Sequence, residues 1–158
     1  MGSTEKGTIR LDIPSRLEML ETAGAVVDQV AKAVGFDEDS RHDILAAVRE
    51  SLVNAIVHGN RGDGARRVTL DLALDGGGLE IRVRDEGRGF DPNRLPDPLA
   101  LENLCKSSGR GILLMKALMD AVDFRRPRSG GTEVTLRKRL ARRVESRSTS
   151  SPASAAGP

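Results

Sequence analysis

Apolar and polar residues alternate along five segments of the chain, and a period of two is typical of strands that bury one face. The first segment places Ile9, Leu11 and Ile13 on one face and ends at Pro14. The second and third are separated by a glycine-rich turn and are expected to form an antiparallel hairpin. The predicted strands are residues 8–13, 67–74, 79–85, 121–126 and 132–140.

Three other segments repeat apolar residues every three or four positions, as amphipathic helices do. The first is predicted to begin at a capping box formed by Ser15 and Glu18 and to end at Gly35. The second is predicted over about residues 37–58. The third has an N-terminus marked by the glycines within residues 109–112.

The second predicted helix carries apolar residues on two opposite faces, so both faces are expected to be covered. Glu50 and Asn54 lie on the less apolar of these faces, four residues and one helical turn apart. Two polar side chains on a covered face favour a functional role, although a solvated glutamate explains Glu50 alone equally well.

Asp85 continues the apolar face of the third predicted strand, after three apolar residues at alternate positions. A buried carboxylate needs a hydrogen-bond partner to offset its desolvation, and the neighbouring sequence offers no evident one. We therefore expect the partner to come from a ligand. Gly87 and Gly89 would let that ligand approach the backbone, although they could equally be turn residues. Thr132 likewise places a hydroxyl on the apolar face of the last strand.

These elements predict an α/β (α+β) two-layer sandwich, with helices on one face of a mixed, mainly antiparallel sheet. One domain is expected over residues 8–140, after a flexible N-terminus of residues 1–7. Residues 141–158 are rich in Arg, Ser, Ala and Pro and are expected to be a disordered tail. Residues 91–108 contain three prolines and predict a long loop, either functional or disordered.

Composition narrows the possible functions. The chain has 158 residues and a net charge of +2, and its 2% aromatic content argues against stacking platforms for single-stranded nucleic acid. The basic residues near the C-terminus are interpreted as a solvated tail. A single cysteine, Cys105, excludes an internal disulfide, and no segment has the pattern of a signal peptide or membrane span. We therefore expect a cytoplasmic protein that binds neither nucleic acid nor membrane directly.

Four of these segments resemble, in order and spacing, the nucleotide-binding motifs of the GHKL ATPase and kinase superfamily, whose ATP-binding module is the Bergerat fold. The pattern Glu-x-x-x-Asn-Ala-x-x-His-Gly and the compact size look like the anti-sigma factor serine/threonine kinases of that superfamily. The resemblance covers about residues 8–140. Its motifs are the helix segment 50–59, the glycine boxes 85–90 and 109–112, and the pair Gly131-Thr132.

The resemblance implies ATP and Mg²⁺ as ligands. Asp85 would accept a hydrogen bond from the adenine amino group, and Thr132 would support the same base edge. ATP affinity should then fall more in Asp85→Ala than in Asp85→Asn, because an amide could still turn its oxygen to the base. Asn54 would offer its carbonyl oxygen to Mg²⁺, and Glu50 would be the general base for a serine hydroxyl. The other implied nucleotide contacts are Gly87, Gly89, Phe90, Gly109, Arg110, Gly111 and Ile112, the last four at the phosphates.

For function, the resemblance implies an anti-sigma factor that is also an ATP-dependent serine kinase, with residues 91–108 as the lid over the nucleotide. Its partners would be a sigma factor and an anti-anti-sigma antagonist with an acceptor serine, and a homodimer is compatible with it. Arg16 is a candidate partner contact or an exposed charge. His58 is interpreted as a structural residue, and His42 receives no role.

Two alternatives remain open. The first is an ATP-gated protein-binding regulator without kinase activity, for which Glu50→Ala would leave regulation intact. The second is a histidine-kinase-like catalytic module. It is disfavoured because such enzymes need a helical dimerisation domain, for which residues 1–7 leave no room.

Overall fold

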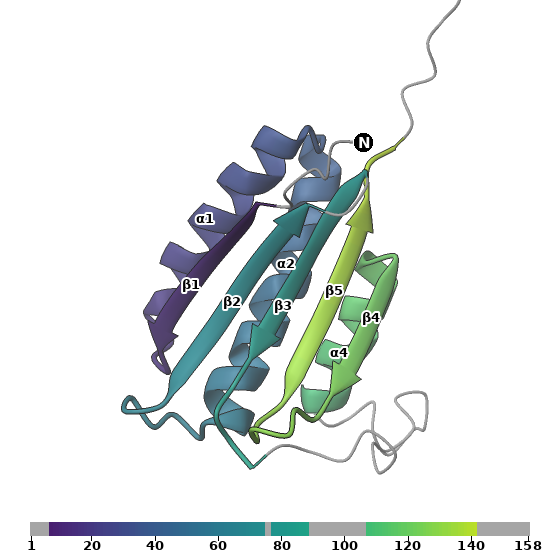
Figure 1. The fold of residues 1–158 in the computed structure, drawn as a ribbon. Helices are drawn as coiled ribbons and strands as arrows, with labels where there is room; N and C mark the ends of the chain where they lie inside the picture. Colours follow the sequence, from purple (N-terminus) through teal and green to yellow (C-terminus); the bar gives the residue numbers. More distant parts are fainter. Residues whose placement is uncertain (1–6, 75–76, 89–106, 142–158) are drawn as a thin grey trace, which may run out of the picture.

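The computed structural model describes residues 7–74, 77–88 and 107–141. Five strands form one sheet in the order β1-β2-β3-β5-β4, and all four neighbouring pairs are antiparallel. The helices lie on one face of this sheet, which confirms the predicted two layers (Figure 1). The strands are β1 (Thr8–Pro14), β2 (Arg67–Leu74), β3 (Gly78–Arg84), β4 (Ala121–Arg125) and β5 (Glu133–Arg139). The helices are α1 (Met19–Val34), α2 (Glu38–Val53), the π-helix η1 (Asn54–Gly59) and α4 (Ser107–Leu118).

The alternation that predicted the strands also sets their register. In the β2–β3 pair Leu70 lies opposite Val83 and Leu72 opposite Ile81, and all four side chains are buried on the helix side. A slip of one residue would turn this set to the other face of the sheet, so burial fixes the pairing. The hydrophobic core therefore lies between the central strands and the helices, with Leu52 of α2 among its fully buried members.

The start of α1 differs from the sequence prediction. The helix begins at Met19 after an N-cap at Glu18, and no side-chain cap forms there. Ser15 is instead buried, and its hydroxyl donates to the backbone carbonyl of Arg66 at 2.8 Å. The predicted capping box is therefore wrong, because a distant loop takes the serine that the local pattern assigned to the helix.

The second predicted helix is found as two joined segments. Asp37 caps α2 by accepting from the backbone amide of Ser40 at 2.8 Å. At Asn54 the helix widens into η1, where the amide of Asn60 donates to the carbonyl of Ala55 at 2.8 Å. The wider turn changes which side chains face the core, so Val57 is 40% exposed and not covered as expected. Single π turns inside α-helices are frequent at functional sites, and this one begins at a predicted site residue.

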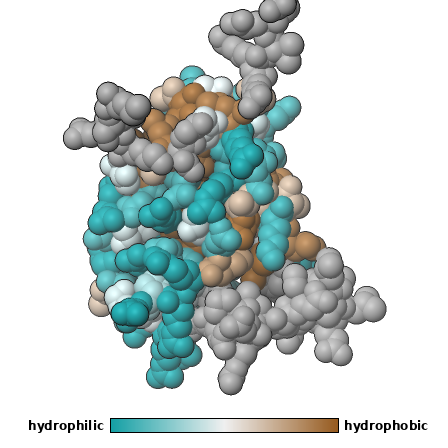
Figure 2. All heavy atoms as spheres, turned by 45° about the vertical axis from the view of Figure 1, so that its right-hand side comes forward, coloured by the Kyte–Doolittle hydropathy of each residue, from teal (hydrophilic) through white to brown (hydrophobic). Residues whose placement is uncertain are grey.

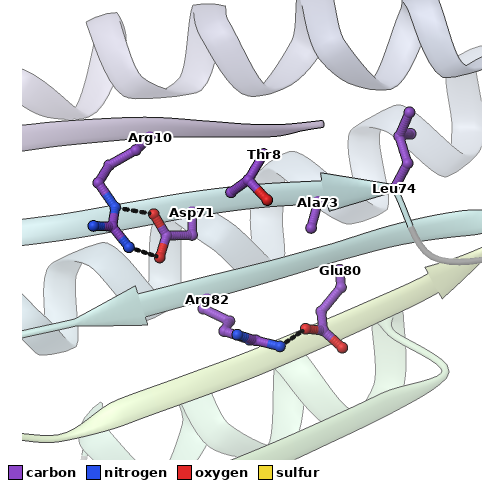
Figure 3. Close-up of a pocket in the computed structure, with 7 residues that line it drawn as sticks. All are labelled: Thr8, Arg10, Asp71, Ala73, Leu74, Glu80 and Arg82. Carbon is purple, nitrogen blue, oxygen red and sulfur yellow. Dashed lines mark hydrogen bonds and ion pairs between the residues drawn. The ribbon is translucent and has the colours of Figure 1, made fainter. Parts of the chain in front are cut away.

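The sheet face opposite the helices carries charged side chains that pair across and along the strands. Figure 3 shows Arg10 of β1 bonded twice to Asp71 of β2, at 2.6 and 2.8 Å, and Arg82 paired with Glu80 on β3. These residues line a hollow of about 610 Å³. Hydrophilic side chains also cover much of the surface drawn in Figure 2. Because its charges already neutralise one another, this hollow is a weaker candidate for a binding site than a cavity with an unpaired polar group.

One ion-pair group on this face predicts a pH-dependent contribution to stability. Burial would raise the pKa of the Glu133 carboxyl, but bonds from Arg84 and Arg125 hold this pKa below its ordinary value. A group with a lowered pKa stabilises the fold above its unfolded pKa and loses this effect as the pH falls through its folded pKa. We expect Glu133→Gln to lower the free energy of unfolding by about 1 kcal/mol at pH 7, since both arginines are partly exposed.

Urea unfolding of the parent and of Glu133→Gln, repeated from pH 7 into the acid range, measures this effect. The gap between the two proteins should close as the pH falls through the folded pKa of Glu133. A gap of unchanged size at both ends of the range would show that the variant acts through packing and not through charge.

Candidate functional site

A cavity of about 440 Å³ lies between the α2–η1 helix, the ends of β3 and β5, and the first part of α4. This volume is in the range of small-molecule sites. Its apolar lining includes Ala55, Ile112 and Val134, and two of its polar residues, Asp85 and Thr132, come from the sheet. The structure therefore brings together residues from all four sequence motifs that were predicted to form one site.

Asp85 follows β3 and is 5% exposed, as its place on the apolar face predicted. One carboxylate oxygen, Oδ1, accepts from the amide of Gly87 at 2.8 Å and from the amide of Thr132 at 3.2 Å. The expectation that the chain itself offers no partner is therefore wrong for this oxygen. The Gly87 bond is a local Asx turn, whereas Thr132 is 47 residues away in sequence and is brought in by the β3–β5 pairing.

The second oxygen of Asp85, Oδ2, accepts no hydrogen bond from the described residues. It lies next to the Cα of Gly59, at the end of η1. Burial raises the pKa of the Asp85 carboxyl, and the bonds from Gly87 and Thr132 and the charge of Arg66 only partly offset this effect. The site thus presents a desolvated acceptor with one oxygen held in place and the other available to a ligand.

Three glycines surround Asp85 because no larger residue fits there. A Cβ at Gly59 would lie 2.4 Å from the Asp85 side chain, and a Cβ at Gly87 would lie 2.0 Å from the Gly59 carbonyl oxygen. A Cβ at Gly131 would collide with the Asp85 carbonyl, and Gly131 also has a φ of +76°. The close approach expected at Gly87 is therefore made by the backbone of Gly59. An additional close approach by a ligand stays a prediction.

Gly131→Ala is expected to reduce stability strongly. The left-handed backbone and the collision with Asp85 together should lower the free energy of unfolding by about 2–4 kcal/mol. Gly24→Ala is the matched control, because Gly24 lies inside α1 with open space around its Cα and should gain about 0.5–1 kcal/mol. Chemical denaturation of both variants measures the difference, and equal stabilities would contradict the crowding described around Asp85.

Asn60 supports the turn that follows Asp85 through hydrogen bonds of its side chain. It was not predicted as a site residue. Its side-chain amide donates to the Ser15 hydroxyl at 2.7 Å and to the Arg67 carbonyl at 2.9 Å. Its oxygen accepts from the amide of Glu86 at 2.8 Å. The sequence marks Asn60 only as a turn residue after the helix, and its partners are known only once the strands are paired.

Glu50 and Asn54 both lie beside the second glycine box. A Cβ on Gly111 would lie 2.7 Å from the Glu50 carboxylate oxygen Oε2 and 3.7 Å from the Asn54 side-chain nitrogen. Asn54 also lines the cavity. Both side chains are partly buried, so the predicted covered face is partly covered here and is exposed at Val57. A larger residue at Gly111 would therefore require the Glu50 carboxylate to move.

The N-terminus of α4 differs from its prediction. The helix begins at Ser107, so Gly109 lies in its first turn, whereas Gly111 and Ile112 lie in the second. Amides of a first helical turn have no partner within the helix, whereas later amides donate along it. Of the predicted phosphate-binding amides, only that of Gly109 falls among the unpaired ones. Arg110 is exposed, and its role in phosphate binding stays a prediction.

Several predicted residues lie elsewhere. Gly89 and Phe90 of the first glycine box fall outside the described residues, as do Cys105, almost all of the proposed lid and nearly all of the two predicted termini. Arg16 is exposed in the turn before α1, three residues ahead of the helix and beside Gly64. Its role in partner binding stays a prediction.

Other cavity residues were missed by sequence reasoning. Arg61, Arg66 and Arg88 bring positive charge to the cavity, and Phe124 contributes an aromatic ring from β4. Arg61 adopts a φ of +54°, a conformation that non-glycine residues rarely occupy. Isolated arginines in turns give no sequence signal because exposed arginines are common everywhere. The remaining polar residues that were missed are Ser51 and His58, of which His58 is exposed at the cavity.

A family model described as the histidine kinase-like ATPase domain matches residues 13–138. The chain belongs to this family. The anti-sigma F factor of Halalkalibacterium halodurans is 32% identical to this chain over 121 residues, covering 75% of this chain and 80% of that protein. The serine-protein kinase RsbW of Oceanobacillus iheyensis is 26% identical over 121 residues, covering 72% of this chain and 76% of that protein.

Solved structures give the same fold for this histidine kinase-like ATPase domain. The RsbU and RsbW domains of Rv1364c from Mycobacterium tuberculosis superpose with a TM-score of 0.62 at 23% identity, covering 85% of this chain and 32% of that chain. A chain of the SiaB-SiaC complex from Pseudomonas aeruginosa superposes with a TM-score of 0.58 at 18% identity, covering 84% of this chain and 88% of that chain. Among the described residues, no helix combines the length and hydrophobicity needed to cross a membrane.

Proposed function

We propose that this chain is an ATP-dependent protein serine kinase and anti-sigma factor that phosphorylates an anti-anti-sigma antagonist protein. The observation that carries the proposal is that two carboxylates lie along the same helical unit, α2 followed by η1. Asp85 lies against the end of η1 and has an available oxygen, while Glu50 lies on α2 beside α4. We infer that Asp85 is the acceptor for the base and that Glu50, beside the second glycine box, is the general base.

The described residues fit ATP at the base end. The cavity has apolar walls, a volume of about 440 Å³ and a buried acceptor at Asp85 Oδ2, which suit a purine with an exocyclic amino group. Thr132 lies beside that acceptor and supports the same base edge through its hydroxyl. Arg88 and the first turn of α4, with the amide of Gly109, are the positive groups toward which the phosphates would extend.

The residues also fit Mg²⁺ in the manner of phosphoryl-transfer sites. The described part of the chain has no cluster of three or more His, Cys, Asp or Glu side chains that could hold a metal ion by itself. Mg²⁺ commonly takes one or two protein oxygens and completes its shell with water and substrate phosphates. Asn54 offers one such oxygen at the cavity. When bound, Mg²⁺ neutralises phosphate charge.

The reaction that this site supports is phosphoryl transfer to a serine. The serine oxygen of the protein substrate bonds to the γ-phosphorus of ATP, the bond from that phosphorus to the β–γ bridging oxygen breaks, and ADP leaves. The hydroxyl proton passes to the carboxylate of Glu50. The added phosphate charge would release the antagonist and leave the kinase free to bind a sigma factor. The names of two relatives, a serine-protein kinase and an anti-sigma F factor, support the kinase and anti-sigma roles.

This function would place the protein in the cytoplasm with a sigma factor and an antagonist as its partners, and a homodimer is a further proposal that rests on the family resemblance. The test is a pull-down from the source cell in ATP and in ADP, followed by incubation with γ-labelled ATP and phosphoserine mapping. Label on a serine of a captured protein is the expected result. Capture of partners without any label would favour the ATP-gated regulator, and capture of no partner would contradict both functions.

A further inference from the structure

Ser51 carries a buried hydroxyl that the described structure leaves without a partner. The residue is 1% exposed, and its Oγ has no hydrogen bond to any of the described residues. Ser51 also lines the 440 Å³ cavity together with Asp85 and Thr132. It lies directly after Glu50 in α2, so it points to a different side of the helix from that residue.

A purely structural explanation of this hydroxyl is weak. Serine inside a helix usually donates to the carbonyl four residues earlier or faces solvent, and Ser51 does neither. Its buried neighbours four residues away are Ala47 of α2 and Ala55 of η1, and an alanine, which is smaller than a serine, would fit the same space. A buried polar group without a partner lowers stability, and an alanine would avoid that loss. The hydroxyl is therefore better explained by a partner that arrives with a ligand.

The cavity indicates which partner this is. Asp85 Oδ2 is an acceptor and suits an exocyclic amino group, which in adenine is flanked by two ring nitrogens that can only accept hydrogen bonds. Ser51 lines the cavity from α2, whereas Asp85 and Thr132 line it from the end of β3 and the start of β5. A serine hydroxyl can donate one hydrogen bond, which matches an acceptor beside the amino group.

We propose that Ser51 is a specificity-determining residue that donates its hydroxyl, directly or through one water, to a ring nitrogen beside the adenine amino group. This proposal rests on the proposed nucleotide function of the cavity. Asp85 would then accept a hydrogen bond from the adenine amino group, and Ser51 would donate one to the neighbouring ring nitrogen. Adenine presents this donor and this acceptor side by side. Guanine presents an acceptor at the position of the amino group and would meet the Asp85 carboxylate unfavourably.

The proposal predicts opposite effects of Ser51→Ala on stability and on binding. Without nucleotide, the variant should melt at a temperature equal to or above that of the parent, because a buried unpaired hydroxyl has been removed. With ATP, its affinity should be about 3- to 10-fold lower than that of the parent, because one neutral hydrogen bond is lost. A merely structural serine would not combine an unchanged or raised melting temperature with weaker binding.

Nucleotide analogues make the test independent of general damage to the site. Calorimetric titrations of the parent and Ser51→Ala should use ATP, 1-deaza-ATP and 7-deaza-ATP, which lack one or the other flanking nitrogen. One of the two analogues should bind the parent about 3- to 10-fold more weakly than ATP binds the parent. The same analogue should bind Ser51→Ala with the affinity that ATP has for Ser51→Ala. The analogue that behaves in this way identifies the nitrogen.

Two results would overturn the proposal. If the parent binds ATP and Ser51→Ala binds it equally well, Ser51 has no role in recognition, and the proposed nucleotide function is unaffected. If both deaza analogues lose the same affinity in the parent and in Ser51→Ala, the hydroxyl does not contact either nitrogen. A parent that fails to bind ATP at all would contradict the proposed function, and this inference with it.

Discussion

Asp85→Asn is expected to bind ATP about 10- to 100-fold more weakly than the parent, although the two side chains have nearly the same shape. The amides of Gly87 and Thr132 both donate to Oδ1 of Asp85, so the oxygen of an asparagine must occupy that position. Its NH₂ group then replaces Oδ2 and faces the cavity. A donor would meet the donating amino group of adenine, and the hydrogen bond would be lost.

This expectation revises the order of the two variants that the sequence suggested. The sequence placed Asp85→Asn above Asp85→Ala in ATP affinity, on the argument that an amide could turn its oxygen to the base. The structure opposes that turn, because it would place the NH₂ group against two backbone donors. Both variants should therefore lose ATP affinity to a similar extent, as measured by calorimetric titration.

The stability of the nucleotide-free variants separates this effect from unfolding. Burial raises the pKa of Asp85, so this carboxyl favours the fold at pH values below its unfolded pKa and loses that effect as the pH rises through its folded pKa. Asp85→Asn removes this pH-dependent contribution, so its melting temperature should fall less than that of the parent as the pH rises through the folded pKa of Asp85. Asp85→Ala should lower the melting temperature, because the amides of Gly87 and Thr132 lose their acceptor. An Asp85→Asn protein that binds ATP as tightly as the parent would remove Asp85 from the base site.

The parts of the site that sequence could predict are those set by local periodicity. Asp85 and Thr132 stand at alternate positions on apolar strand faces, and both are buried at the cavity as that pattern requires. Glu50 and Asn54 share a helix face through their spacing, and both lie against Gly111. In each case the period of the element alone places the side chain on the correct face.

The parts that sequence missed depend on contacts between distant segments. The internal partner of Asp85 comes from Thr132, and the donors of Asn60 reach Ser15, 45 residues away. The change from α2 to η1 at Asn54 is equally invisible, since its residues are compatible with a continuous α-helix. Ser51 was missed for a different reason. Its hydroxyl on an apolar stripe resembles that of Thr132, and the same argument applied to the helix would have identified it.

Glu50→Gln is expected to reduce phosphate transfer to the protein substrate about 10²- to 10⁴-fold, the usual contribution of a positioned general base. The exchange keeps the shape that packs against Gly111, so the helix crossing and the cavity should be unchanged. ATP affinity should remain close to that of the parent, because Asp85 and Thr132 line the cavity whereas Glu50 is not one of its lining residues. Single-turnover transfer from γ-labelled ATP to the captured partner measures the rate.

Glu21→Gln is the matched control, since Glu21 is an exposed glutamate on α1 and its replacement should leave both ATP binding and transfer unchanged. The comparison distinguishes the two leading functions. A general base predicts a loss of transfer with intact ATP binding, and therefore a partner that stays unphosphorylated and bound. If Glu50→Gln and Glu21→Gln both transfer phosphate at the parent rate, the proton must go elsewhere, and Glu50 is then only a packing residue beside α4.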